Sequence, residues 1–105
     1  MLAKTNRLTT KEFATIYQSG KTFHGTYFVI KVLHAEQFKA GVSISKKVYK
    51  TAVARNRLKR QVYAALWPYL HTSLQIVVIA KKSIGQPTFT DLQNDMKGVL
   101  DTISV

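Results

Sequence analysis

A short basic string near the middle of the chain holds residue types that bind phosphate. It reads Arg55-Asn56-Arg57-Leu58-Lys59-Arg60. Arginine can hold a phosphate through two parallel hydrogen bonds, lysine acts as a mobile point charge, and an asparagine amide can bond to a sugar or a base edge. This combination suits the backbone of a folded RNA, whereas the alternative is a basic helical face that is only solvated surface.

The charge of the whole chain favours a polyanionic partner. The 105 residues include 16 Lys and Arg against five Asp and Glu, for a formal net charge of +11. Seven of the basic residues lie between Lys46 and Arg60, and residues 37–90 contain no acid. A compact body this basic repels itself unless a polyanion neutralises it, so we expect nucleic acid as the partner.

Several other classes of protein fit the composition poorly. Without cysteine the chain has no disulfide and no thiolate nucleophile or metal ligand. The histidines His24, His34 and His71 are scattered and the acids lie outside the basic block, so we expect no catalytic residue and no metal site. No apolar stretch approaches the ~20 residues of a spanning helix and the N-terminus lacks a secretory apolar region, which predicts a cytoplasmic protein without a membrane partner.

The spacing of apolar residues predicts one α+β domain over residues 1–105. The expected elements, in chain order, are a helix over 10–19, one long strand or two short strands over 21–33, a strand over 40–45, a helix over 52–67, a strand over 74–80 and a helix after Thr90. The apolar run over 74–80 is typical of a strand covered on both faces and paired in parallel after a helical crossover. This order predicts an αβββαβα two-layer sandwich.

Capping residues predict where the first and last helices begin and where the first helix ends. Thr9 and Glu12 form a capping box, and Thr90 and Gln93 form a possible second one. Gly20 is expected to close the first helix in the left-handed conformation.

A helical wheel separates the basic string into two parts. Leu58 and Val62 belong to the apolar stripe that should pack on the sheet, and Arg55 lies toward this stripe, where it could support the start of the helix. The outward face is predicted to hold Asn56, Lys59, Arg60 and Tyr63. Because the apolar stripe is small and is needed to cover the sheet, no hydrophobic face remains for lipid.

Two motifs at a fixed distance give the chain a specific resemblance. The strand end Gly41-Val42-Ser43-Ile44-Ser45-Lys46-Lys47 precedes the basic string, Asn6-Arg7-Leu8 precedes an early Phe13, and a Val-Val-Ile-Ala strand follows the helix. Over nearly its whole length the chain resembles the protein subunit of bacterial ribonuclease P. The resemblance implies the ribonuclease P protein fold, which is like that of domain 2 of ribosomal protein S5.

The resemblance also implies a function and partners. In that family an RNA subunit hydrolyses the phosphodiester bond, and the protein helps it to bind precursor tRNA and remove the 5′ leader, which generates the mature tRNA 5′ end. The implied partners are the ribonuclease P RNA and precursor tRNA, with no obligate protein partner. The chain would be a subunit of an endoribonuclease whose Mg²⁺ acts at the RNA, and we expect no cofactor on the protein alone.

Carrying the family's motifs over residue by residue gives two sets of candidate contacts. The resemblance implies that the RNA is bound by Lys46, Lys47, Lys50, Arg55, Asn56, Arg57, Lys59 and Arg60. It implies that a cleft for the leader is lined by Phe13, Tyr17, Lys31, Ser43 and Ser45. Phe13 could instead pack against Leu8 as a hydrophobic staple.

The chain departs from the family's pattern at two of these places. Family members often have an aromatic residue on the cleft strand where this chain has Lys31, which could replace stacking by phosphate attraction. They often continue the basic motif with an arginine and an acid where this chain has Tyr63 and Ala64. Tyr63 could stack on a base or simply cover the helix.

One alternative function fits the charge but not the paired motifs. A noncatalytic ribosomal or RNA-assembly protein would also combine a basic surface with an α+β sandwich, because a fold does not determine a function.

Overall fold

The computed structural model describes residues 6–69, 72–82, 84–85 and 87–103, and the predicted order of elements is confirmed. The elements are α1 (Thr10–Ser19), β1 (Lys21–His24), β2 (Phe28–His34), β3 (Lys39–Ser43), α2 (Ala52–Leu66), the short 3-10 helix η2 (Trp67–Tyr69), β4 (Leu74–Ala80) and α3 (Phe89–Ile103). The region 21–33 therefore forms two strands, with the break directly after His24, as one of the two alternatives predicted.

The four strands form one sheet in the order β1-β2-β4-β3. β1 and β2 pair antiparallel, as do β2 and β4, whereas β3 and β4 pair parallel across the α2 crossover. β3 ends at Ser43, two residues before the predicted end. The chain leaves the sheet there because the Ser45 carbonyl accepts hydrogen bonds from Val48 N and Tyr49 N in a tight turn.

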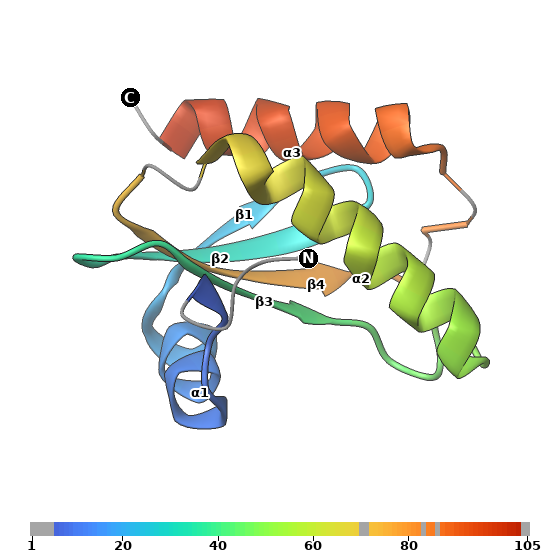
Figure 1. The fold of residues 1–105 in the computed structure, drawn as a ribbon, viewed down its shortest axis with the longest axis horizontal. Helices are drawn as coiled ribbons and strands as arrows, with labels where there is room; N and C mark the ends of the chain where they lie inside the picture. The colour runs from blue at the N-terminus through green and yellow to red at the C-terminus, as the bar shows by residue number, and fades with distance from the viewer. Residues whose placement is uncertain (1–5, 70–71, 83, 86, 104–105) are drawn as a thin grey trace.

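The sheet is covered differently on its two faces, as Figure 1 shows: α2 and α3 lie side by side above it, and α1 lies below it. Ile30, Ile76 and Val78 belong to the core beneath α2 and α3. The buried residues Val77 and Ile16 lie outside that cluster. Val77 alternates with its neighbours in β4 and so faces α1, which contacts this strand. The prediction that β4 is covered on both faces is confirmed.

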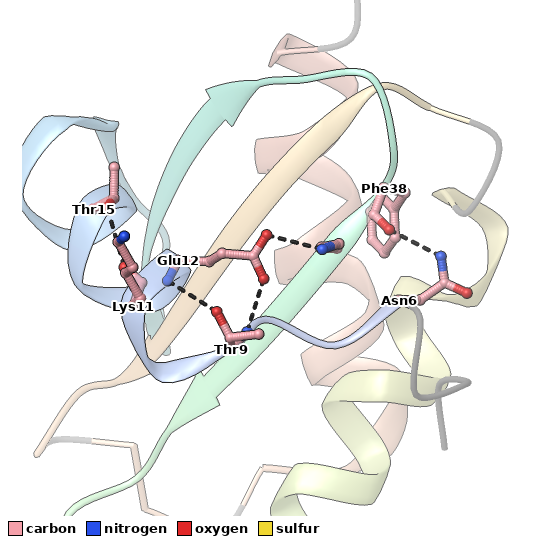
Figure 2. A network of polar contacts seen from close by, with 7 residues as sticks. Asn6, Thr9, Lys11, Glu12, Thr15 and Phe38 are labelled. Carbon is pink, nitrogen blue, oxygen red and sulfur yellow. Dashed lines mark hydrogen bonds and ion pairs between the residues drawn. The ribbon is translucent and has the colours of Figure 1, made fainter.

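The start of α1 is as predicted and also ties the helix to the sheet. Thr9 Oγ1 accepts a hydrogen bond from Glu12 N at 3.2 Å, and Glu12 Oε1 accepts one from Thr9 N at 3.0 Å. The other carboxylate oxygen of Glu12 pairs with Lys39 Nζ at 2.8 Å, on strand β3. Figure 2 shows this carboxylate between the helix start and the strand. The segment before α1 is held in turn by Asn6 Nδ2, which donates to Phe38 O at 2.9 Å.

Two predicted helix boundaries are wrong in their details. Gly20 follows α1 in an extended conformation with φ −71°, not in the left-handed region. A side chain is excluded there by contact, because a Cβ would lie 2.7 Å from Ile16 O and 3.1 Å from Val32 O. The capping box of α3 uses Thr88 and Asp91 in place of the predicted Thr90 and Gln93. The side chain of Ile103, at the end of α3, lies outside the described residues.

The Glu12 contacts make a pH-dependent contribution to stability. The hydrogen bond from Lys39, followed by that from the Thr9 backbone, lowers the Glu12 pKa from its ordinary value of 4.5 to about 2. A depressed pKa gives stability that is present above pH 4.5 and is lost as the pH falls toward 2. Glu12→Gln can keep the capping box but removes the charge. We expect its urea midpoint to be lower than that of the wild type at pH 7 and to approach the wild-type value near pH 2.

The control for this measurement is Glu36→Gln, at an exposed acid in the loop between β2 and β3. Its midpoint should follow that of the wild type across the same pH range. A Glu12→Gln difference that stays constant from pH 7 to pH 2 would contradict the assignment to the ionised carboxylate.

Gly41 lets α1 approach β3 closely. A Cβ at this position would lie 2.9 Å from Phe13 Cδ2 and 3.3 Å from Leu8 Cδ1. Gly41→Ala should therefore displace the Phe13 ring and lower the free energy of unfolding by about 1 kcal/mol. Gly98→Ala is the matched control, because Gly98 lies in α3 with nothing within 4 Å of its added Cβ. There the change should stabilise the protein by about 1 kcal/mol, and urea denaturation distinguishes the two signs.

Candidate nucleic-acid interface

Part of the sheet face beneath α1 remains open. Val29, Ile79 and Ser43 pair across three strands, so their side chains lie in one row on the same side of the sheet. All three are half-buried, whereas Val77 and Gly41 in the adjacent row are buried under α1. The accessible row and the flank of α1 together form a surface that we call the cleft.

Aromatic residues of α1 and a lysine of β2 form one side of the cleft. Phe13 and Tyr17 stack with their ring centroids 6.5 Å apart and an angle of 17° between the rings. Lys31 Nζ lies 4.3 Å from the centre of the Tyr17 ring and donates to Tyr17 O at 2.8 Å. Tyr17 is 50% exposed, so part of its ring can receive a ligand. The cleft thus presents an aromatic surface beside a positive charge.

The surroundings of Phe13 agree with packing at the staple position, and its contact with the leader stays a prediction. Its ring lies against Gly41 beside Leu8, which agrees with packing at the staple position. Phe13 is nonetheless half-buried and stacks on Tyr17, so it supports the ring that is more exposed.

Exposed basic residues follow the cleft directly along the chain. Ser45, Lys46 and Lys47 are exposed in the turn after β3, and Lys50 is exposed before α2. Because Ser43 ends the strand in the accessible row, these lysines lie where the cleft meets the start of α2. We call Ser45–Lys50 the basic turn.

The outer side of α2 adds further donors. Thr51 caps the start of α2, and its Oγ1 accepts a hydrogen bond from Ala54 N at 3.2 Å. Asn56 and Arg60 are exposed, which confirms the predicted outward face at these two positions, whereas Lys59 of the same face is half-buried. Arg57, which lies farther round the helix, is also exposed.

Arg55 differs from its neighbours in the basic string. Its Nη1 donates to Tyr49 O at 2.9 Å and to Lys50 O at 3.0 Å, so the side chain holds the end of the basic turn against α2. The prediction that Arg55 supports the start of the helix is confirmed, while its contact with RNA remains a prediction.

Tyr63 is not on the outward face, and that prediction was wrong. It is only 9% exposed and belongs to the core cluster. Burial raises the pKa of its hydroxyl, and the charge of Arg7 and the Val42 backbone partly oppose the rise. The Tyr63 hydroxyl lies near the Val42 backbone of β3 and within the influence of the Arg7 charge, so this side of α2 faces the sheet and the N-terminal segment that bridges to Ala40.

Arg7 is a candidate site residue that the sequence argument did not assign. It is exposed, and it influences Tyr63, which lies one turn after Lys59 and Arg60 on α2. The Leu8 N–H donates to Ala40 O at 3.2 Å and keeps the segment along the strand. The sequence signal was available, because Arg7 lies within one of the motifs of the resemblance.

Three of the five acids lie on α3, and each of them accepts a hydrogen bond. Asp95 accepts hydrogen bonds from Thr26 N at 2.7 Å and from Tyr27 N at 3.0 Å, which fixes the turn between β1 and β2. Asp101 accepts a bond from Tyr69 Oη at 3.0 Å. Burial and this bond raise the Tyr69 pKa to about 12. All five acids lie outside the basic turn and α2, and Figure 1 shows α3 beside α2 on the same face of the sheet.

The remaining titratable residues form no cluster in the part of the chain that the structure describes. No group of three His, Asp or Glu residues there could hold a metal ion. His24 and His34 are exposed, and His71 lies outside the described residues. Within the same ranges no helix is long and apolar enough to cross a membrane.

Comparison with known proteins gives a consistent result. The model of the family described as Ribonuclease P matches residues 2–104. The ribonuclease P protein component of a Pseudanabaena species is 38% identical, over 95% of this chain and 92% of its own. The structure of the Staphylococcus aureus RNase P protein superposes with a TM-score of 0.83 at 27% identity, over 95% of this chain and 96% of that one. The Thermotoga maritima RNase P protein, at 24% identity, has the same fold with a TM-score of 0.81 over 94% and 98% of the two chains. The chain belongs to the ribonuclease P protein family.

Proposed function

We propose that this chain binds the RNA subunit of ribonuclease P together with the 5′ leader of precursor tRNA, and so promotes endonucleolytic removal of the leader. The observation that carries the proposal is the continuity of the cleft with the basic turn. Ser43 lies in the accessible row of the sheet, and Lys46 and Lys47 follow it three and four residues later. A single-stranded leader in the cleft would therefore lie beside a surface suited to folded RNA.

The cleft suits a single strand because it combines stacking with charge. An unpaired base can stack on the accessible part of the Tyr17 ring, and base–aromatic stacking tolerates any sequence. Lys31 beside that ring can attract the adjoining phosphate, and the hydroxyls of Ser43 and Ser45 can bond to phosphate or sugar oxygens. Phe13 supports Tyr17 from within α1.

The basic turn and the outer side of α2 suit the RNA subunit. The proposed contacts are Lys46, Lys47, Lys50, Asn56, Arg57, Lys59, Arg60 and, in addition, Arg7. Arg55 positions the turn through its carbonyl contacts. In this role the chain contributes charge and binding surface, and the RNA subunit carries out hydrolysis with its Mg²⁺. The complex would act in the cytoplasm. Positive charge that neutralises phosphates also reduces the need for free Mg²⁺.

Reconstitution with the ribonuclease P RNA of the same organism tests the proposal. At low Mg²⁺ the protein should markedly increase the rate of leader removal from precursor tRNA, with a smaller gain at high Mg²⁺. Circular dichroism checks that the protein is folded. A folded protein that binds RNA but leaves the cleavage rate unchanged would refute the proposal and favour the ribosomal or RNA-assembly alternative.

A further inference from the structure

A groove runs between the first turns of α2 and the segment that leads into α3. It has a volume of about 750 Å³. Its walls are formed by Tyr49, Thr51, Val53, Ala54, Arg57, Leu58, Gln61, Pro87, Thr88 and Phe89. The described lining of the groove shares Arg57 with the RNA contacts proposed above and shares no residue with the cleft.

Two exposed apolar residues from different helices line the groove. Val53 is 79% exposed on α2, and Phe89 is 38% exposed at the start of α3. Leu58, which is only 3% exposed, contributes an apolar floor. A single exposed hydrophobic residue is ordinary, but two that converge on one concavity indicate a binding surface.

Hydrogen bonds hold the walls of the groove in place. Tyr49 Oη donates to Gly85 O at 2.6 Å, and Arg55 Nη1 donates to Tyr49 O. On the other side, Thr88 and Asp91 form the capping box that fixes the first turn of α3. The groove is therefore formed before any ligand binds, which lowers the entropy cost of binding.

The polar residues of the groove suit a nucleotide. Val53, Arg57 and Gln61 are spaced four residues apart and lie along one side of α2, with the exposed Arg57 in the middle. The described residues that line the groove include no acid, and the carboxylate of the nearby Asp91 accepts a hydrogen bond from Thr88 N. A planar ring between a phenyl group and a guanidinium, with an amide at its edge, is a common way to bind an unpaired base.

We propose that this groove binds an unpaired nucleobase of the RNA subunit. The base stacks on Phe89, Arg57 contacts its ring or its phosphate, and Gln61 hydrogen-bonds to its edge. The inference rests on the proposed function, because it names a second point of contact with the same RNA partner. A protein docked on the same apolar surface is the competing occupant, and the experiment distinguishes the two.

Substitutions in the groove test this assignment. Phe89→Leu keeps an apolar side chain but removes the stacking ring, and it should weaken binding of the ribonuclease P RNA by about fivefold to tenfold. Val53→Ser should weaken binding less, without disturbing α3. The matched control is Trp67→Leu, at a 58% exposed aromatic residue at the other end of α2, which should bind RNA like the wild type. Filter binding measures the affinity, and thermal unfolding checks the fold of each variant.

The outcomes separate this inference from the proposed function. If the wild type binds the RNA and Phe89→Leu binds it equally well, the groove is not an RNA site, whereas a wild type without affinity refutes the function itself. In a nuclear magnetic resonance titration, millimolar AMP should shift the Val53 methyl signals of the wild type. Shifts that persist in Phe89→Leu would overturn stacking on Phe89. Self-association that Val53→Ser abolishes in sedimentation experiments would assign the groove to a second copy of the chain.

Discussion

Replacing Arg57 and Arg60 together with alanine should weaken binding of the ribonuclease P RNA by about 10-fold to 100-fold at physiological salt. Both side chains are exposed on the outer side of α2. Because the variant neutralises fewer phosphates, its binding releases fewer counterions from the RNA. The slope of log K against log salt should therefore become shallower by about 1.5 to 2. Filter binding over a series of salt concentrations measures both quantities.

The fold should survive this double substitution. Exposed charges contribute little to stability, and alanine favours the helix. The matched control neutralises two exposed lysines elsewhere, Lys21 on β1 and Lys97 on α3. That variant loses the same net charge but should keep most of the affinity. Equal losses in the two variants would mean that overall charge, and not the α2 surface, determines binding.

Tyr17→Ala should weaken binding of precursor tRNA to the reconstituted holoenzyme by about 5-fold to 100-fold, because the stacking surface in the cleft is lost. Binding of mature tRNA, which has no leader, should not change. Tyr17→Phe keeps the ring and should bind precursor tRNA almost as the wild type does. Since Tyr17 is half exposed, its removal should cost less than about 1 kcal/mol of stability.

Lys31 gives this prediction a second test. Its ammonium group lies on the Tyr17 ring, so the two side chains should act together on the leader. We expect Lys31→Met and Tyr17→Ala to be non-additive in a double-mutant cycle for precursor tRNA. If either variant lost the same affinity for precursor tRNA as for mature tRNA, this would contradict a role of the cleft in leader binding.

Much of the fold was predictable because its determinants are local. The αβββαβα order follows from hydrophobic periodicity, and the capping box at Thr9 and Glu12 involves residues three apart. The parallel pairing of β4 was indicated by its continuous apolar run. The exposure of Asn56 and Arg60 followed from the helical wheel, since the apolar stripe of α2 determines which side faces the sheet.

The wrong predictions concern places where distant segments meet. Gly20 has no room for a side chain because the Ile16 and Val32 carbonyls lie close to it. Tyr63 is buried in the core cluster near the Val42 backbone of β3 and Arg7, and a helical wheel of α2 alone contains neither of these segments. The α3 capping box lies two residues earlier than predicted, since two overlapping threonine motifs are equally plausible locally.

By itself the sequence determined the basic string, its helix, the strand end before it and the family to which they point, because periodicity and charge are properties of neighbouring residues. Only the tertiary structure decided which side chains are buried and which distant residues join the candidate binding surfaces. Tyr63 became part of the core, Arg7 joined the candidate surface from the N-terminal segment, and Phe89 of α3 lines the same groove as Val53 of α2. Such contacts depend on which segments the sheet brings together, and burial and hydrogen bonding are then settled by neighbours that lie dozens of residues away.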